Sequence, residues 1–376
     1  MRQTERGGTE RTGQLGAFLL ALALLLVLTV FAHRVVLGLA AVIAGPLPAA
    51  RTALSLSRKA MQETVPDETP GSIASEPAPE SAPEAAAPAN TGMESYLAAL
   101  EADDARPADA GAVQEKTYPH GSGEKYIPCG GGSIKNNTRV PAAEVAAEIT
   151  NPLPFAVEWN SPDPQILIMH THATESFEPY DSEIYDTRHT WRSTDNSENI
   201  VAAGEVMAQA IRSHGIEVLH DDTQHDYPSY NGSYERSAET VKEYLAKYPS
   251  IKVVLDVHRD AVQRDSTLVK PVTQINGKKA AQMMIIAGCD DGTMEMPNWG
   301  KNLRFAAGIQ DAIESRWKGL TRPIFFCYRK YNQDLTTGSL LLELGSHGNT
   351  LEQVLTTAQL AGDAIGNYLA QECMAE

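Results

Sequence analysis

The chain has 376 residues and a formal net charge of −17, from 48 acidic and 31 basic residues. This acidic balance, without a basic stripe along the chain, excludes the usual classes of nucleic-acid-binding protein. The four cysteines, Cys129, Cys289, Cys327 and Cys373, are widely spaced and form no CxxC motif, so the sequence indicates unpaired thiols rather than a zinc finger or a disulfide framework.

The N-terminal segment predicts a membrane anchor. Residues 1–13 are polar and carry three arginines, and residues 14–32 are an almost unbroken run of apolar side chains. A helix of that length can cross most of a hydrocarbon core, which is roughly 30 Å thick, and the arginines before it favour a cytoplasmic N-terminus. The alternative is a cleaved signal peptide with its cleavage site near Pro46. We favour the uncleaved single-pass anchor, and either interpretation exports the rest of the chain.

A juxtamembrane segment and an acidic linker rich in proline and alanine follow at residues 33–115. Stretches such as SEPAPESAPEAAAPAN have few side chains that can bury apolar area, so ordering them brings too little free energy to offset the lost chain entropy. Prolines and like charges keep such a tether extended. From residue 116 the composition becomes that of a globular protein, and the length of residues 116–376 suits one catalytic domain.

The globular part alternates between two patterns. Short apolar runs predict strands at residues 166–169, 216–219, 251–255, 282–287, 323–327 and 340–344. Longer segments with helical periodicity predict helices at residues 199–215, 234–248, 299–317 and 350–371. Strands that alternate with helices are typical of an α/β fold, here a mostly parallel sheet with helices on both faces.

Two long polar segments interrupt this alternation, at residues 176–197 and 221–233. Both are rich in aromatic side chains, and loops of this length in a compact domain are usually functional or mobile. One interpretation makes them a platform for a polymeric, partly sugar-like substrate. The other makes their aromatic residues anchors that pin the loops to the domain, and the sequence does not choose between the two.

Two of the predicted strands lead into side chains that bind metals. The run at 166–169 is followed by His172 and Glu175, and the run at 251–255 is followed by His258. Because ligands bind beyond the carboxyl ends of parallel strands, these side chains are expected to meet at one edge of the sheet. Two imidazoles and one carboxylate form a recurring zinc set that leaves a position for water. The sequence therefore predicts that Zn²⁺ is held by His172, Glu175 and His258.

Further residues are expected to support this site. His170 lies two residues before His172 and, because alternate residues of a strand share a face, is expected beside the metal or the substrate. Asp256 is expected to orient His258, as carboxylates often do for metal-bound imidazoles. Arg259 is expected either to hold a substrate carboxylate or a developing oxyanion, or to form a salt bridge with Asp260 or Asp256.

Glu198 precedes the helix predicted at 199–215 and has two interpretations. It is first of all a candidate helix cap or first-turn acid. It is also an alternative third metal ligand in place of Glu175, because a glutamate at the start of that helix can reach the end of the first strand.

Glu343 is a charged residue within the apolar run LLLEL. Unpaired carboxylates are rarely buried, so a glutamate in a core strand requires a partner or a function. A metal-activated water is a suitable partner, with Glu343 as the catalytic base that passes the proton to the leaving amine. A structural ion pair within the sheet is the alternative.

At these motifs the chain resembles the stage II sporulation protein P family. The matching segments are HTHATESF at 170–177, VLHDDTQHDYPSYNGSYERS at 218–237, LDVHRDA at 255–261 and LLELGSHGNTLEQ at 341–353. The last is similar to the LVE-G-x-x-SN pattern of zinc N-acetylmuramoyl-L-alanine amidases, in which the glutamate is catalytic, and Glu343 takes that place. Their IVIDPGH pattern, laid on ILIMHTH, places the metal histidine at His172, and His258 stands for the later one. The chain lacks their GHGG loop and a clear counterpart of their ligand glutamate, which leaves Glu175 and Glu198 as alternatives.

The resemblance implies a zinc amidase that cuts the bond between the muramic lactyl group of peptidoglycan and L-Ala of the stem peptide, with endopeptidase activity as an addition. It implies a role in forespore engulfment, between the mother cell and forespore membranes. It also implies two partners, a lytic transglycosylase and a polytopic membrane protein. Without the resemblance, the chemistry of the residues predicts only an exported, metal-dependent amide hydrolase. The competing hypotheses are a zinc carboxypeptidase or endopeptidase of the cell wall and a non-catalytic wall-binding scaffold.

Overall fold

The structure of the chain, a computed structural model, describes residues 109–374. The predicted anchor at 14–32 and residues 33–108 of the predicted juxtamembrane segment and linker lie outside this range. Within residues 109–374, no helix combines the length and the apolarity needed to cross a membrane.

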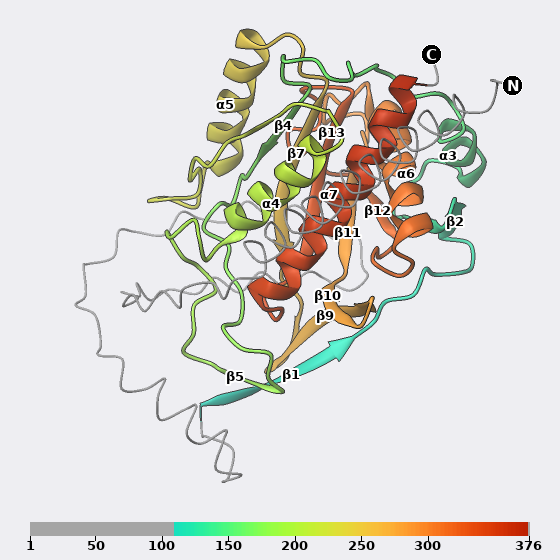
Figure 1. Ribbon diagram of the computed structural model, residues 1–376. Coiled ribbons are helices and arrows are strands. Elements are labelled where there is room, and N and C mark those ends of the chain that lie inside the picture. Colours follow the sequence, from blue (N-terminus) through green and yellow to red (C-terminus); the bar gives the residue numbers. More distant parts are fainter. Residues whose placement is uncertain (1–108, 375–376) are drawn as a thin grey trace, which may run out of the picture. The chain divides into compact units, whose positions relative to one another are not determined.

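An eight-stranded sheet forms the centre of the described fold (Figure 1). Its strands, in spatial order, are β2 (Tyr126–Cys129), β3 (Gly132–Asn136), β12 (Ile324–Cys327), β11 (Met283–Gly288), β13 (Gly338–Ser346), β7 (Val253–Asp260), β4 (Ile166–Met169) and β6 (Val218–His220). Every residue of β4 and β7 is buried, as expected of central strands covered on both faces.

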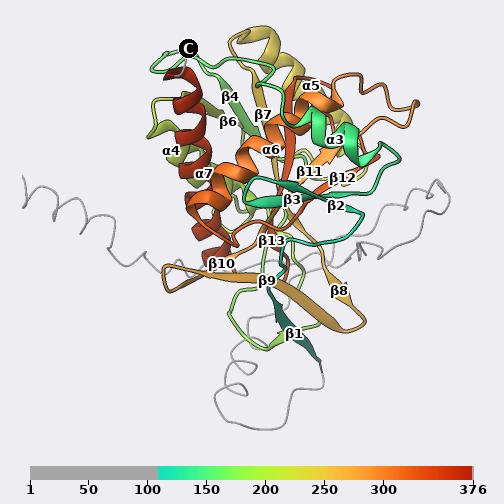
Figure 2. The ribbon, with the colours of Figure 1, turned by 90° about the vertical axis from the view of Figure 1, so that its right-hand side faces the viewer.

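In the described part of the chain, this sheet is accompanied by the helices α3 (Ala142–Glu148), α4 (Ile200–Arg212), α5 (Ser233–Lys247), α6 (Trp299–Arg316) and α7 (Leu351–Met374). Buried residues of α4, α6 and α7 form the main core with one face of the sheet. Figure 2 shows α4 and α7 to the left of β4 and β7, and α5 to their right. On that second side, Val241 of α5 packs against Leu167, Met169 and Val254. The second face is therefore covered by a smaller set of apolar contacts.

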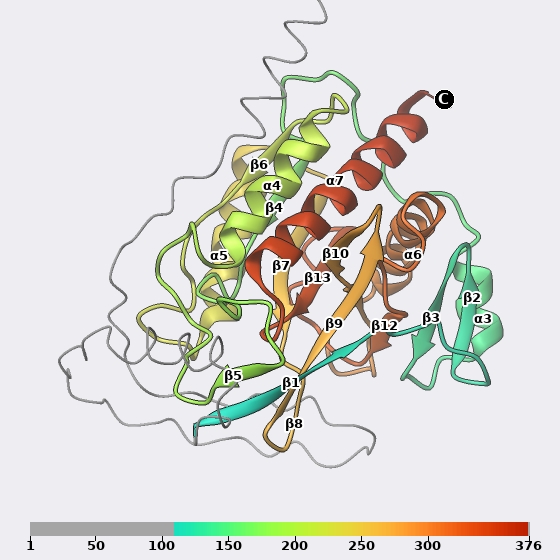
Figure 3. The ribbon, with the colours of Figure 1, turned by 60° about the horizontal axis from the view of Figure 1, so that its bottom comes forward.

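A second sheet lies outside the predicted elements. Its strands are β10 (Lys278–Ala281), β9 (Thr267–Ile275), β1 (Ala110–Lys116) and β5 (Ile184–Asp186), and β8 (Gln263–Arg264) pairs with β9. Figure 3 shows β1 between β9 and β5. Residues 110–115, assigned to the linker from their composition, are thus part of the fold. β5 belongs to the long segment at 176–197, so this strand pairing orders the middle of that loop.

The prediction of a mostly parallel sheet is wrong, because both sheets are mixed. In the large sheet, β11 runs antiparallel to β13 and β2 runs antiparallel to β3. The cause is the path of the chain between β7 and β11. It returns through β8, β9 and β10 without a crossover helix, whereas parallel neighbours require a long crossover connection.

The three strands that lead into the candidate site nevertheless run parallel and adjacent to one another. β13 pairs with β7, and β7 pairs with β4, both in parallel. β7 and β13 extend past their apolar runs, to Asp260 and Ser346. The register of β13 shifts between Glu343 and Ser346, where Gly345 has φ of +69° and a Cβ would stand 2.6 Å from Asn349 Oδ1. This irregularity requires glycine and ends the regular ladder just beyond Glu343.

Candidate active site

The strand register places the predicted residues on one face of the sheet. His258 of β7 is the Cα partner of Glu343 of β13, and Asp256 of β7 is the partner of Met169 of β4. Because alternate residues of a strand share a face, Asp256 and His258 project to the same side. The intervening Val257 points into the main core on the other side.

His172, Glu175 and His258 come together on this face. The rings of His172 and His258 meet edge to face, with centroids 5.3 Å apart, and His258 Nδ1 lies 3.7 Å from Glu175 Oε2. All three residues are buried, with exposed fractions of 6%, 2% and 3%. The structure therefore encloses two imidazoles and a carboxylate in one small cluster.

Asp256 fixes the orientation of His258. Its Oδ1 accepts a hydrogen bond from His258 Nε2 at 2.7 Å, and its two oxygens also accept from the backbone and the hydroxyl group of Thr171. Burial alone would lower the pKa of His258, but the charge and hydrogen bond of Asp256, with Glu175 and Glu343 nearby, raise it to about 10. With Nε2 bound to Asp256, Nδ1 of His258 is the ring nitrogen that faces Glu175.

Glu343 brings a carboxylate with an unused oxygen to this cluster. Within residues 109–374, its Oε2 is buried and has no hydrogen-bond partner. Burial and the negative charge of Asp260 raise the pKa of Glu343 to about 8, against the opposite influence of His258 and Arg322. A carboxyl group with a pKa near neutrality, beside imidazoles in a buried site, has the properties of a proton carrier in catalysis.

Arg259 is held by the protein itself. Its Nε and Nη2 donate to the carbonyl oxygens of Ser176 and Trp191, each at 3.0 Å, and its Nη1 lies 3.8 Å from Glu175 Oε1. Its backbone N–H also donates to Glu175 Oε2 at 3.0 Å. Arg259 thus pins the segment at 176–197 and positions Glu175, and its ion pair is with Glu175 rather than with Asp256 or Asp260. Its expected role in substrate binding stays a prediction.

The ring of His170 contacts His220 and α4 rather than the cluster of His172, Glu175 and His258. Its Nδ1 donates to the carbonyl oxygen of Val257 at 2.7 Å, and its Nε2 lies 3.0 Å from His220 Nε2. A Cβ on Gly204 of α4 would stand 2.4 Å from His170 Nε2, so α4 packs closely over this ring. The alternation argument fails because β4 ends at Met169 and the chain turns directly after His170.

The buried neutral ring of His170 predicts a loss of stability in acid. Burial and the neighbouring His220 lower the pKa of His170 from 6.5 to about 3, so the unfolded chain binds the proton more readily between these values. The free energy of unfolding should fall by ~1.5 kcal/mol between pH 6.5 and pH 5 through this group alone. His170→Asn keeps a donor near Val257 and removes the titration. Urea unfolding at the two pH values should show a smaller decrease for this variant, and equal decreases would contradict the prediction.

Glu198 is neither the helix cap nor part of the cluster. The cap of α4 is Asn199, whose side chain accepts from the backbone N–H of Val201 at 2.9 Å. The side chain of Glu198 forms no hydrogen bond or ion pair with any residue between 109 and 374. Between the two glutamates left open by the sequence, the structure places Glu175 against His258 and leaves Glu198 apart.

The segment at 221–233 supplies neighbours of His172 that were not named from the sequence. Tyr230 stacks on the His172 ring with centroids 4.5 Å apart, and Asp226 Oδ2 lies 4.0 Å from His172 Nδ1. Asp226 also accepts from Arg192 Nη1 at 2.9 Å, and the Arg192 guanidinium lies over the Tyr230 ring. The aromatic content of both segments indicated a functional role, but the sequence does not show that the two segments contact each other beside His172.

The donor set matches the chemistry of zinc, although its atoms are not spaced as they would be around a bound ion. Among the residues from 109 to 374, no group of three or more His, Cys, Asp or Glu has the spacing of a metal site. Atoms that share a tetrahedral zinc at 2.0–2.1 Å stand roughly 3.3 Å apart, and His258 Nδ1 and Glu175 Oε2 are slightly farther apart, at 3.7 Å. The buried, unbonded Oε2 of Glu343 is the second observation in favour of a bound group at this place.

Solved structures with partial similarity include amidases and a metallo-carboxypeptidase. The CwlD amidase from Clostridioides difficile, in complex with the GerS lipoprotein, matches with a TM-score of 0.36 at 13% identity. The match covers 56% of this chain and 100% of the amidase chain. A metallo-carboxypeptidase from Burkholderia cenocepacia matches with a TM-score of 0.32 at 9% identity. The match covers 63% of this chain and 70% of the carboxypeptidase chain. At these scores the similarities support no conclusion about activity.

Sequence comparison gives a direct assignment. Stage II sporulation protein P of Bacillus subtilis (strain 168) is 28% identical over 212 residues, which are 53% of this chain and 49% of that protein. The chain thus spans about half the length of this curated relative. The model of the family described as stage II sporulation protein P matches residues 80–366. With most of its length matched, the chain belongs to the stage II sporulation protein P family.

Proposed function

We propose that this chain is a zinc-dependent N-acetylmuramoyl-L-alanine amidase of peptidoglycan. The observation that carries the proposal is the pairing of Glu343, with its buried and unbonded Oε2, to His258 in a cluster with His172 and Glu175. Membership of the stage II sporulation protein P family supports a role in the cell wall during sporulation.

His172, Glu175 and His258 would hold the zinc ion. Asp256 favours this role by occupying Nε2 of His258 and leaving Nδ1 directed toward Glu175. A bound zinc ion would polarise the scissile carbonyl and lower the pKa of a water ligand to about 7.

Glu343 is the proposed general base. Its Oε2 accepts a proton from the attacking water, and the same carboxyl group then donates that proton to the leaving nitrogen of the stem peptide. Burial raises the pKa of Glu343 to about 8 in the metal-free chain, and the positive charge of a bound zinc ion would lower it toward neutral pH, where the carboxylate can take up and return a proton. Tyr230, which stacks on His172, and Arg192, which lies over the Tyr230 ring, are the proposed substrate contacts.

The proposed location follows from the anchor. With residues 14–32 in the membrane and the domain exported, the enzyme acts on the wall between the mother cell and forespore during engulfment. A lytic transglycosylase, which cuts the glycan strands, and a polytopic membrane protein are the proposed partners. Family membership supports this setting.

Product analysis tests the reaction. Full-length protein loaded with zinc is incubated with purified sacculi, and the new ends are identified by mass spectrometry. The proposal predicts new amino termini of L-Ala together with free lactyl groups on muramic acid. Released D-amino acids, or opened cross-links with intact stems, would instead identify a carboxypeptidase or an endopeptidase.

A further inference from the structure

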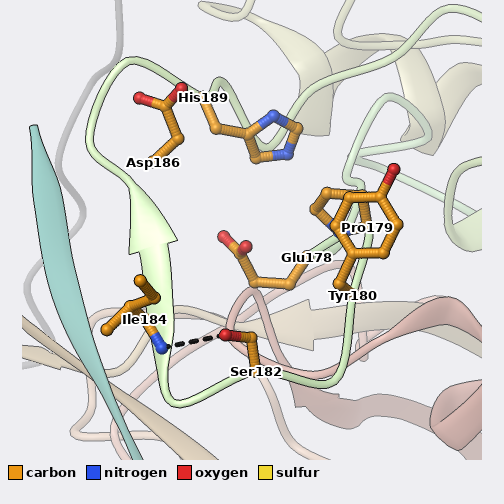
Figure 4. Close-up of a pocket in the computed structure, with 7 residues that line it drawn as sticks. All are labelled: Glu178, Pro179, Tyr180, Ser182, Ile184, Asp186 and His189. Atoms are coloured by element: carbon orange, nitrogen blue, oxygen red, sulfur yellow. Dashed lines mark hydrogen bonds between the residues drawn. The ribbon is translucent and has the colours of Figure 1, made fainter. Parts of the chain in front are cut away.

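A small pocket lies in the segment that follows the candidate active site. Figure 4 shows the carboxylate of Glu178 pointing into the middle of this pocket. The other lining residues are Pro179, Tyr180, Ser182, Ile184, Asp186 and His189. Ile184 and Asp186 belong to β5, which β1 holds in the second sheet.

Glu178 is a buried carboxylate with one unused oxygen. The residue is 6% exposed, and its Oε1 accepts from Trp191 Nε1 at 2.5 Å. No residue between 109 and 374 donates a hydrogen bond to its Oε2. Burial raises the pKa of Glu178 to about 7, against the influence of the Trp191 hydrogen bond. The positive charge of Lys270 also lowers this pKa, although Lys270 forms no hydrogen bond with the carboxylate. The side chain therefore keeps one free acceptor oxygen.

The charge of the second carboxylate of the pocket, Asp186, is already paired with an arginine. Asp186 accepts from Arg188 Nε at 2.8 Å and from Arg188 Nη2 at 2.7 Å. Burial also lowers the pKa of His189, so this ring brings no positive charge at neutral pH. Tyr180 is 43% exposed and presents an aromatic ring at the pocket, and such rings attract cations. Of the two carboxylates that line the pocket, Glu178 is therefore the one without a hydrogen bond from a cationic side chain.

We propose that this pocket binds a primary ammonium group at the end of a ligand side chain. The proposal rests on the proposed function, in which the ligand is a peptidoglycan stem peptide whose diamino acid carries such a group. An ammonium group is compact and offers three donors, so it can reach Glu178 Oε2 in a narrow pocket. Its charge offsets the desolvation of the carboxylate.

The pocket has a fixed relation to the candidate active site. The backbone N–H of Glu178 donates to the carbonyl oxygens of His347 and Asn349, which follow β13. Trp191, whose indole donates to Glu178, accepts from Arg259 through its carbonyl oxygen at 3.0 Å. A stem peptide held in the pocket would therefore extend along the segment that also positions Glu175.

Binding to two forms of one polymer tests the proposal. The full-length chain carrying Glu343→Gln, which is expected to bind without hydrolysis, is mixed with purified sacculi whose amines are free or N-acetylated. Cosedimentation should show roughly tenfold weaker binding to the acetylated sacculi, as expected for the loss of one charge-assisted contact. Equal binding to both forms, or no binding to either, would overturn the proposal.

A second substitution assigns the preference to Glu178. In the same background, Glu178→Gln should bind both sacculi as weakly as the acetylated form, and Glu178→Asp, which keeps the charge, should restore part of the preference. Glu183→Gln removes an exposed carboxylate from the same segment and should retain the full preference. Retention of the preference by Glu178→Gln, with unchanged thermal unfolding, would reject the site. Because binding is measured, the result does not depend on whether the chain is an amidase.

Discussion

Glu343→Gln is expected to abolish measurable release of stem peptides from sacculi, with kcat reduced by ~100-fold or more, because a positioned general base contributes about 10²–10⁴-fold. Glutamine has the shape of glutamate but cannot accept and return a proton. The zinc content of the purified variant should remain at the wild-type value, because Glu343 is not a proposed ligand. Hydrolysis is measured as released peptide per unit time, and metal content by elemental analysis of the same samples.

The stability of this variant separates a catalytic effect from a folding defect. The pKa of Glu343 is raised from 4.5 to about 8, so the folded protein binds its proton more tightly than the unfolded chain. Metal-free wild-type protein should therefore lose stability through this group as the pH rises from 4.5 to about 8. Glu343→Gln should lack this decrease and be at least as stable at pH 8. Glu352→Gln, at an exposed glutamate, is the control and should hydrolyse sacculi at the wild-type rate. The proposed base would be rejected if Glu343→Gln kept the wild-type rate, or if both variants lost activity to the same extent.

His258→Gln is expected to lose both zinc and activity. The Nε2 atom of glutamine can still donate to Asp256, whereas the nitrogen that faces Glu175 is removed. Zinc affinity should fall by more than the roughly 10–100-fold that follows loss of an outer hydrogen-bond partner of a ligand. Competition with a chromogenic chelator measures the affinity, and peptide release from sacculi measures the activity.

His225→Gln is the matched control for that substitution. His225 is also buried, but its ring nitrogens contact the carbonyl oxygen of His170 and the hydroxyl group of Thr240. This variant should keep its zinc even if its melting temperature falls. Equal zinc affinities for wild type and His258→Gln would remove His258 from the ligand set, and a common loss in both variants would indicate unfolding rather than loss of a ligand.

The central strands and long helices could be predicted from apolar patterns, because burial on both faces leaves a continuous run such as that of β4. The second sheet could not. β9 carries Pro271 and the buried Lys270 within a strand. β1 lies at the end of an acidic linker, and only one of its residues is buried. These strands are stabilised by long-range pairing and by ion pairs from Lys270 to Glu115 and Asp181, which local composition does not reveal.

The residues of the candidate site could be identified from the sequence where strand order alone determines their position. His258 and Glu343 follow apolar runs, and parallel neighbours bring such residues to one edge. His170 was misplaced because the exact end of β4 decides which way its ring points. Asp226 and Tyr230 were not identified because their contact with His172 requires the 221–233 segment to fold back over the 176–197 segment, and loop conformation has no periodic signal.

Anomalous diffraction at the zinc absorption edge, from crystals of the zinc-loaded protein, tests the central claim most directly. One peak is predicted between His172, Glu175 and His258 Nδ1, within hydrogen-bonding reach of Glu343 through one bound water. A peak at Glu198, or no peak among these side chains in crystals that contain zinc, would contradict the account.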